Sequence, residues 1–146
     1  MNKDNSAAIN VPAAHDSLEK IVSLLNDIFE DEDCPDEERF KIELAVEEIF
    51  VNIADYAYEN IKGNVDVTIQ IKTENDIKTI EITFIDGGKP FDPLLHEDPN
   101  ISLPPEKREI GGLGIMLMKK NMDSVSYSFV NNSNKTTLSK SWSGKQ

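Results

Sequence analysis

The chain has 146 residues, 38% of them hydrophobic and 29% charged, which is typical of a soluble globular protein with one real core. Its formal net charge of −12 argues against binding nucleic acid or an anionic membrane by general attraction, and it fits either solubility alone or a partner with a basic surface. No run of about 18 apolar residues occurs, so we expect no membrane span.

Two features of the sequence favour the cytoplasm. Residues 1–6 are polar and carry no apolar signal core, so we expect no export. Cys34 is the single cysteine and cannot form an internal disulfide, which fits a reducing compartment. Its acidic neighbours, Asp33 and Asp36 among them, should raise the pKa of its thiol and leave it unreactive. We expect one domain over residues 1–146.

The first half of the chain predicts one strand and two helices. Residues 7–11 predict a short edge strand, and residues 15–30 repeat apolar side chains at helical spacing. A second helix is expected over residues 36–58, because Pro35 and the acidic residues after it suit a first helical turn. The apolar members expected in this helix include Phe40, Leu44, Ile49, Ile53 and Ala57.

The second half predicts two pairs of strands around a short helix. Apolar and polar residues alternate in the runs 65–71, 80–84, 125–129 and 136–142. The helix is expected over residues 113–121, after a proline-containing segment, residues 91–109, that is too long for an ordinary loop. Grouped helices and paired strands indicate an α+β fold, a two-layer sandwich whose mixed, mostly antiparallel sheet is covered on one face by helices.

Two polar residues in the second helix could carry chemistry. Glu48 and Asn52 are four residues apart, so a helix places them on one face. A carboxylate can accept a proton from a hydroxyl or water, and an amide oxygen is a hard ligand suited to Mg²⁺. The alternative is an ordinary solvated helix face.

Two glycine-containing stretches follow. Asp86 ends an apolar strand, where its carboxylate could accept a hydrogen bond from the amino group of a base, and Gly88 would leave room for a flat ring. Gly111, Gly112 and Gly114 open a helix, and free N–H groups there make a phosphate cradle. The alternatives are an Asp-Gly turn and a plain glycine turn.

Taken in this order, the three motifs resemble the N, G1 and G2 boxes of the histidine-kinase-like ATPase superfamily, which has the Bergerat ATP-binding fold. The matching residues are Glu48-x-x-x-Asn52, Asp86-x-Gly88 and Gly111-Gly112-x-Gly114. Within the superfamily the chain looks most like the small bacterial anti-sigma-factor serine/threonine kinases. The resemblance runs over about residues 7–142 and includes the element order and the long loop.

The resemblance implies a role for each of these residues. Asn52 would coordinate the Mg²⁺ that bridges the ATP phosphates, and Glu48 would act as base toward the acceptor hydroxyl. Asp86 would hydrogen-bond the adenine amino group, and Gly88 would admit the adenine ring. The glycines that would shape the phosphate pocket are Gly111, Gly112 and Gly114.

The resemblance also makes residues 92–110 an ATP lid. Lys107 and Arg108 are the lid cations available to the phosphates, although a charged loop is also the default for solvation. Either Thr136 or Thr137 matches the strand threonine near adenine, and we assign Thr137 to the site.

The function expected from the resemblance is that of an ATP- and Mg²⁺-dependent serine/threonine kinase and anti-sigma factor. It would hold a sigma factor and phosphorylate an anti-anti-sigma (STAS-type) protein, without direct contact to nucleic acid or membrane, and a homodimer is one expected assembly. The acidic Glu48 motivates this, because histidine-kinase ATP domains usually place asparagine there. The family often has a histidine after the asparagine, whereas residues 55–58 read DYAY, so a catalytically inactive, nucleotide-gated binding module stays an alternative. A detached histidine-kinase-type ATPase domain is a third.

Overall fold

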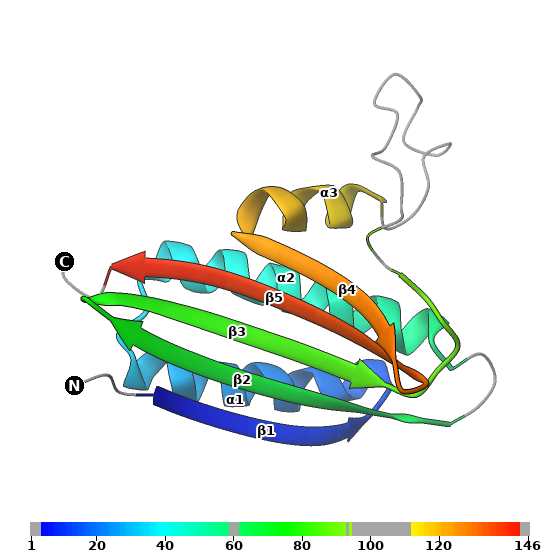
Figure 1. Cartoon of the computed structure of the whole chain (residues 1–146). Coiled ribbons are helices and arrows are strands. Elements are labelled where there is room, and N and C mark those ends of the chain that lie inside the picture. The colour runs from blue at the N-terminus through cyan, green and yellow to red at the C-terminus, as the bar shows by residue number, and fades with distance from the viewer. Residues whose placement is uncertain (1–3, 59–61, 93, 95–111, 144–146) are drawn as a thin grey trace.

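A computed structural model of the chain describes residues 4–58, 62–92, 94 and 112–143. Its strands form one five-stranded sheet, α1 and α2 cover one face of that sheet, and α3 lies beside α2 (Figure 1). The elements in chain order are β1 (Asp4–Pro12), η1 (His15–Ser17), α1 (Leu18–Asp31), α2 (Asp36–Tyr56), β2 (Asn64–Glu74), β3 (Ile77–Asp86), α3 (Gly112–Asn121), β4 (Ser124–Val130) and β5 (Ser133–Ser143).

The strand order is β1-β2-β3-β5-β4, and every neighbouring pair is antiparallel. Two tight hairpins join β2 to β3 and β4 to β5. Their turn residues have φ values of 52° and 66° at Asn75 and Asp76, and of 55° and 60° at Asn131 and Asn132. Asn and Asp tolerate this left-handed region better than other side chains, which is why these turns reverse the chain here. The expected α+β fold is confirmed, with a sheet that is antiparallel throughout.

The core lies between the sheet and the helices. Alternation in β2 turns Val65, Val67, Ile69 and Ile71 toward the helices, where all are fully buried. The buried face of α1 packs over them through Ile21, Leu25, Ile28 and Phe29. Each such side chain contributes roughly 1.5–3 kcal/mol when it leaves water. Among the described residues, no helix has the length and apolarity needed to cross a membrane.

Helix α2 buries only part of its apolar residues. Of the apolar residues expected in this helix, Ile49, Ile53 and Ala57 are buried, whereas Phe40 and Leu44 are 64% and 40% exposed. The apolar residues that repeat at three- and four-residue spacing along the helix face the sheet. They are Ile42, Ala45, Val46, Ile49, Phe50 and Ile53.

Cys34 lies in the connection between α1 and α2 and is buried. Burial raises the pKa of its thiol to about 12, while the nearby Arg39 opposes the rise and Glu38 and Asp36 add to it. The expected direction is therefore correct, but burial is the main cause and the acidic neighbours are a minor one.

A buried lysine ties α3 to the rest of the fold. Lys140 points to the helix side of β5, and its Nζ donates to the carbonyl oxygen of Asn121 at 2.6 Å. The same Nζ lies 3.4 Å from Glu38 Oε2 on α2 and 3.8 Å from Asp123 Oδ1. A cation at the C-terminal end of a helix is favoured by the helix dipole, and buried charges need such partners. Lys140 thus holds the C-terminal end of α3 in place.

Candidate functional site

Asp86 ends β3 on the helix-facing side of the sheet and is 3% exposed. Its Oδ1 accepts two hydrogen bonds, from the Gly88 amide at 3.0 Å and from Asn134 Nδ2 at 2.9 Å. Burial raises the pKa of this carboxyl, and the two donors oppose that rise. Within the described residues no group donates to Oδ2, which leaves that oxygen as an acceptor for a ligand.

Asn134 was not singled out from the sequence, yet it is the centre of this hydrogen-bond network. It pairs with Asp86 in the register of β3 and β5 and is itself buried. Its Nδ2 also donates to the Lys89 carbonyl at 2.7 Å, and its Oδ1 accepts from the Phe91 amide at 3.0 Å and from the Tyr127 hydroxyl. The available signal was its place on the inner face of an alternating strand, where an apolar side chain is the rule.

Gly88 lets the loop after β3 pack against the end of α2. A Cβ at this position would lie 2.6 Å from the carbonyl carbon of Ala57 and closer still to its oxygen. The Lys89 amide donates to that same oxygen at 3.0 Å. The close approach of two chain segments therefore requires the glycine, and its expected role in admitting an adenine ring stays a prediction.

Two tyrosines near the end of α2 brace the same loop. The Tyr58 hydroxyl accepts from the Gly87 amide at 2.6 Å. The ring of Tyr56 lies 5.4 Å from the ring of Phe91, between centroids. These contacts give the DYAY run of residues 55–58 a structural role in holding the loop.

Glu48 and Asn52 lie on one face of α2, as their spacing predicts. Asn52 is buried, and its Nδ2 donates to the Glu48 carbonyl at 2.7 Å and to Glu48 Oε1 at 3.1 Å. The amide thus orients the carboxylate. In the described part of the chain no donor reaches Asn52 Oδ1, an oxygen of the kind that Mg²⁺ takes as a ligand, although the described residues hold no cluster of three or more His, Cys, Asp or Glu side chains that could bind a metal.

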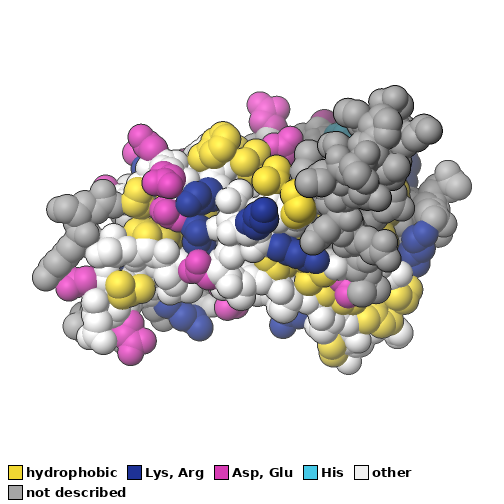
Figure 2. All heavy atoms as spheres, turned by 90° about the horizontal axis from the view of Figure 1, so that it is seen from above, with side chains coloured by type: hydrophobic (Ala, Val, Ile, Leu, Met, Phe, Trp, Pro, Cys, Tyr) yellow, Lys and Arg dark blue, Asp and Glu magenta, His cyan; other side chains and the backbone are white. Residues whose placement is uncertain are grey.

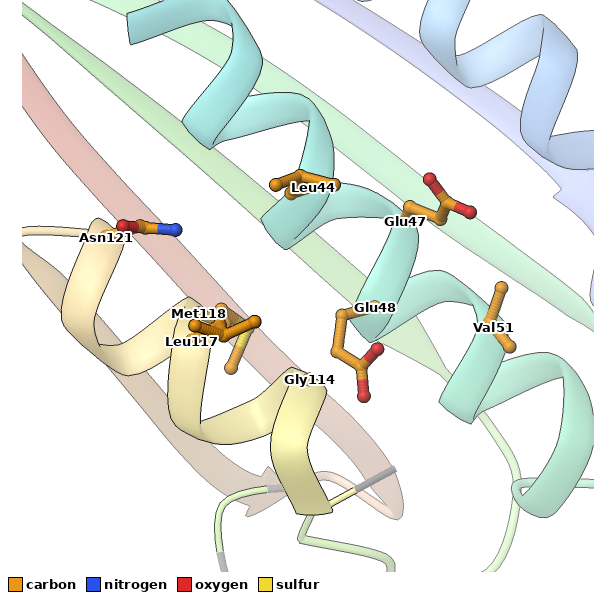
Figure 3. Close-up of a pocket in the computed structure, with 8 residues that line it drawn as sticks. All are labelled: Leu44, Glu47, Glu48, Val51, Gly114, Leu117, Met118 and Asn121. Atoms are coloured by element: carbon orange, nitrogen blue, oxygen red, sulfur yellow. The ribbon is translucent and has the colours of Figure 1, made fainter. Parts of the chain in front are cut away.

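The Glu48 carboxylate packs against the first turn of α3 (Figure 3). A Cβ built on Gly114 would lie 2.6 Å from Glu48 Oε1 and closer still to Oε2. Helix α3 begins at Gly112, so the carboxylate lies at the end where helical N–H groups are unpaired and the dipole is positive. The same end of the helix favours phosphate oxygens.

A cavity of about 250 Å³ opens between α2 and α3 next to this carboxylate (Figure 3). Hydrophobic side chains reach the surface on this side of the molecule (Figure 2), and Leu44 and Leu117 are among those exposed. The residues that line the cavity are Leu44, Glu47, Glu48, Val51, Gly114, Leu117, Met118 and Asn121.

Four of the residues expected at the site need separate mention. Gly111, Lys107 and Arg108 lie outside the described residues. Thr137 lies on the face of the sheet opposite Asp86, where its hydroxyl is 3.5 Å from that of Thr83. It therefore cannot join the Asp86 network, and Thr136, which is buried on the helix side, is the threonine on the correct face.

One comparison with known proteins identifies the family of the chain. The family model described as the histidine kinase-like ATPase domain matches residues 11–140, a range that holds Glu48, Asn52 and Asp86. The comparison with curated proteins finds no match. Because the match covers most of the chain, including all its described helices and strands β2, β3 and β4, the chain belongs to the histidine kinase-like ATPase domain family.

Proposed function

We propose that the protein binds ATP between β3, α2 and α3 and transfers its γ-phosphate to a serine or threonine hydroxyl of another protein. One observation carries the proposal. The Glu48 carboxylate is oriented by Asn52, lies at the first turn of α3 and borders a cavity that opens beside it. A base, a phosphate-binding helix end and room for an acceptor therefore meet at one place.

The adenine would be read at Asp86. Because Oδ1 already accepts from Gly88 and Asn134, the adenine amino group would donate to Oδ2. The phosphates would lie at the N-terminal turn of α3, which begins at Gly112. Asn52 Oδ1 would ligate Mg²⁺, which when bound neutralises phosphate charge.

Glu48 would act on the acceptor. As the hydroxyl oxygen forms its bond to the γ-phosphorus and the bond from that phosphorus to ADP breaks, the hydroxyl proton passes to the Glu48 carboxylate. The Asn52 amide would hold the carboxylate during this step through its bond to Oε1 at 3.1 Å. The chain would thus supply positioning and a proton acceptor.

We also propose the partners. By resemblance, the acceptor is an anti-anti-sigma protein of the STAS type and the second partner is a sigma factor, both met in the cytoplasm. Two properties support protein partners: the net charge of −12, which suits a basic surface, and the apolar side chains exposed beside the cavity, Leu44 and Leu117. The acceptor segment would reach Glu48 along this cavity.

A second candidate is a nucleotide-gated binding module without transfer. The tight packing of the Glu48 carboxylate on Gly114 favours it, because a carboxylate that stays there with ATP bound leaves little access for a hydroxyl. In that case ATP would change only the affinity for a partner.

Incubation with γ-labelled MgATP and an anti-anti-sigma protein from the same organism separates the two candidates. Transfer of label by the parent, with strong loss in Glu48→Gln and Asn52→Ala, supports the kinase. Glu43→Gln makes the same chemical change five residues earlier on α2, outside the cavity lining, and should behave as the parent. ATP binding by calorimetry without transfer to any acceptor tested would favour the binding module.

A further inference from the structure

Asn134 holds more elements of the nucleotide site together than any residue singled out from the sequence. Its amide group engages Asp86, Lys89, Phe91 and Tyr127 at once. Nδ2 donates two hydrogen bonds and Oδ1 accepts two, which is the full hydrogen-bonding capacity of a carboxamide. Its position is therefore determined from four sides, and the orientation of its N–H toward Asp86 is fixed.

This fixed orientation bears on base recognition. Adenine presents an amino donor where guanine presents a carbonyl acceptor, so a carboxylate, which only accepts, favours adenine. A protonated carboxyl could donate to guanine and would lose this preference. Asn134 donates to Oδ1 of Asp86 and so stabilises the ionised form against the effect of burial.

We propose that Asn134 is a specificity-determining positioning residue, which keeps Asp86 as a pure acceptor and thereby makes the site select adenine over guanine. The inference rests on the proposed function, because it takes Asp86 as the residue that reads the base. It goes beyond a structural role for Asn134, since loss of loop support alone would weaken adenine and guanine nucleotides equally.

Two tyrosines near Asp86 keep the same charge over the pH range of the experiment described below. Tyr58, two residues past the end of α2, and Tyr127 on β4 are two titratable side chains whose pKa the Asp86 charge raises. Burial raises the pKa of both above the ordinary value of 10.0, so neither changes charge between about pH 5 and 8.

Three variants test the proposal. Asn134→Ala removes the donor. Asn134→Asp keeps the shape but offers a donor only while the introduced carboxyl is protonated. Ser139→Ala is the matched control, because it removes a side-chain hydrogen bond on the other face of the same strand, that between Ser139 and Ser124. Affinities for ATP and for GTP are measured by calorimetry at about pH 5.5 and pH 8.

The expected results are specific. Asn134→Ala binds ATP about tenfold or more weakly, as for loss of a bond to a charged group, while GTP binding changes less, so the ratio of the two affinities falls. Asn134→Asp recovers ATP binding at the lower pH and loses it at the higher pH, where two adjacent carboxylates repel. Parent and Ser139→Ala show neither effect. An unchanged affinity ratio in Asn134→Ala, or an Asn134→Asp with the pH dependence of the parent, overturns the proposal.

A measurement without nucleotide separates this inference from the proposed function. In the ligand-free protein, carboxyl NMR titration should show a higher pKa for Asp86 in Asn134→Ala than in the parent, and equal values would overturn the coupling of the two residues. If the parent binds no adenine nucleotide, the proposed function fails and specificity has no meaning, whatever this titration shows.

Discussion

Gly114→Ala should separate phosphate transfer from folding. The new Cβ would lie 2.6 Å from Glu48 Oε1 and closer to Oε2, whereas ordinary contacts begin at 3.4 Å. The carboxylate must therefore move by about 1 Å, which is a displacement that can cost about 100-fold in rate. Because the obstructing atoms are the far end of a flexible side chain, the backbone need not shift.

The effect on stability should be small for the same reason. Alanine is favoured over glycine inside a helix by about 1 kcal/mol. An off-rotamer glutamate costs about 0.5–1.5 kcal/mol, and the lost bond from Asn52 about 1 kcal/mol. The net change in the free energy of unfolding should therefore stay within about 2 kcal/mol of the parent.

The assay combines three measurements on parent and variant: single-turnover transfer from MgATP, ATP affinity by calorimetry, and urea unfolding. Gly87→Ala is the matched control, because a Cβ there meets only the Tyr58 hydroxyl at 3.6 Å, an ordinary contact. A variant that binds ATP and transfers phosphate as fast as the parent would refute the placement of Glu48 at the reacting atoms. A decrease of several kcal/mol in the free energy of unfolding would refute the view that only the Glu48 carboxylate moves to make room for the new Cβ.

Three further predictions concern stability and pH. Gly88→Ala should lose about 2–4 kcal/mol in urea unfolding, since its Cβ meets the Ala57 backbone and displaces a backbone hydrogen bond; an unfolding midpoint equal to that of Gly87→Ala would contradict this. Asp86→Asn should lose ATP binding in calorimetry. Because the pKa of Asp86 is raised in the folded protein, ionisation of this carboxyl lowers the free energy of unfolding of the parent as pH rises through that pKa. The variant should therefore be more stable than the parent near pH 7, and this difference should disappear in acid. A stability difference that does not depend on pH would be inconsistent with a buried carboxylate. The thiol of Cys34, with a pKa of about 12, should make the parent lose stability relative to Cys34→Ala as pH rises from 9.0, where the unfolded thiol ionises; parallel unfolding curves from pH 8 to 10.5 would argue against it.

The sequence predicted what local patterns can determine. Alternation in β2 and β3 depends on neighbouring residues, and the structure has both strands over the expected runs 65–71 and 80–84 and extends each at its ends. The spacing of Glu48 and Asn52 is likewise local, so their common face followed from helical geometry.

What the sequence could not settle depends on contacts between distant segments. The sequence named Phe40 and Leu44 among the apolar residues of α2 without separating them from the buried ones, because packing on the sheet decides which apolar side chains face the core. The choice of Thr137 over Thr136 failed for a related reason. A shift of one residue reverses the face of a strand, and the register of β5 is set by its pairing with β3.

Asn134 and Gly88 show the same limit at the site. Asn134 meets Asp86 across 48 residues of sequence, so only the register reveals the pair. Gly88 was recognised as special, but the segment that approaches it, the end of α2 at Ala57, is visible only in the folded chain.

The central claim, that Glu48 is the base of a phosphate transfer, is tested most directly by the single-turnover rate of Glu48→Gln at saturating MgATP with a bound acceptor protein. The account predicts an ATP affinity within about threefold of the parent and a transfer rate lower by about 10²–10⁴-fold, the usual contribution of a positioned general base. Transfer at the parental rate by a variant that binds ATP normally would contradict it.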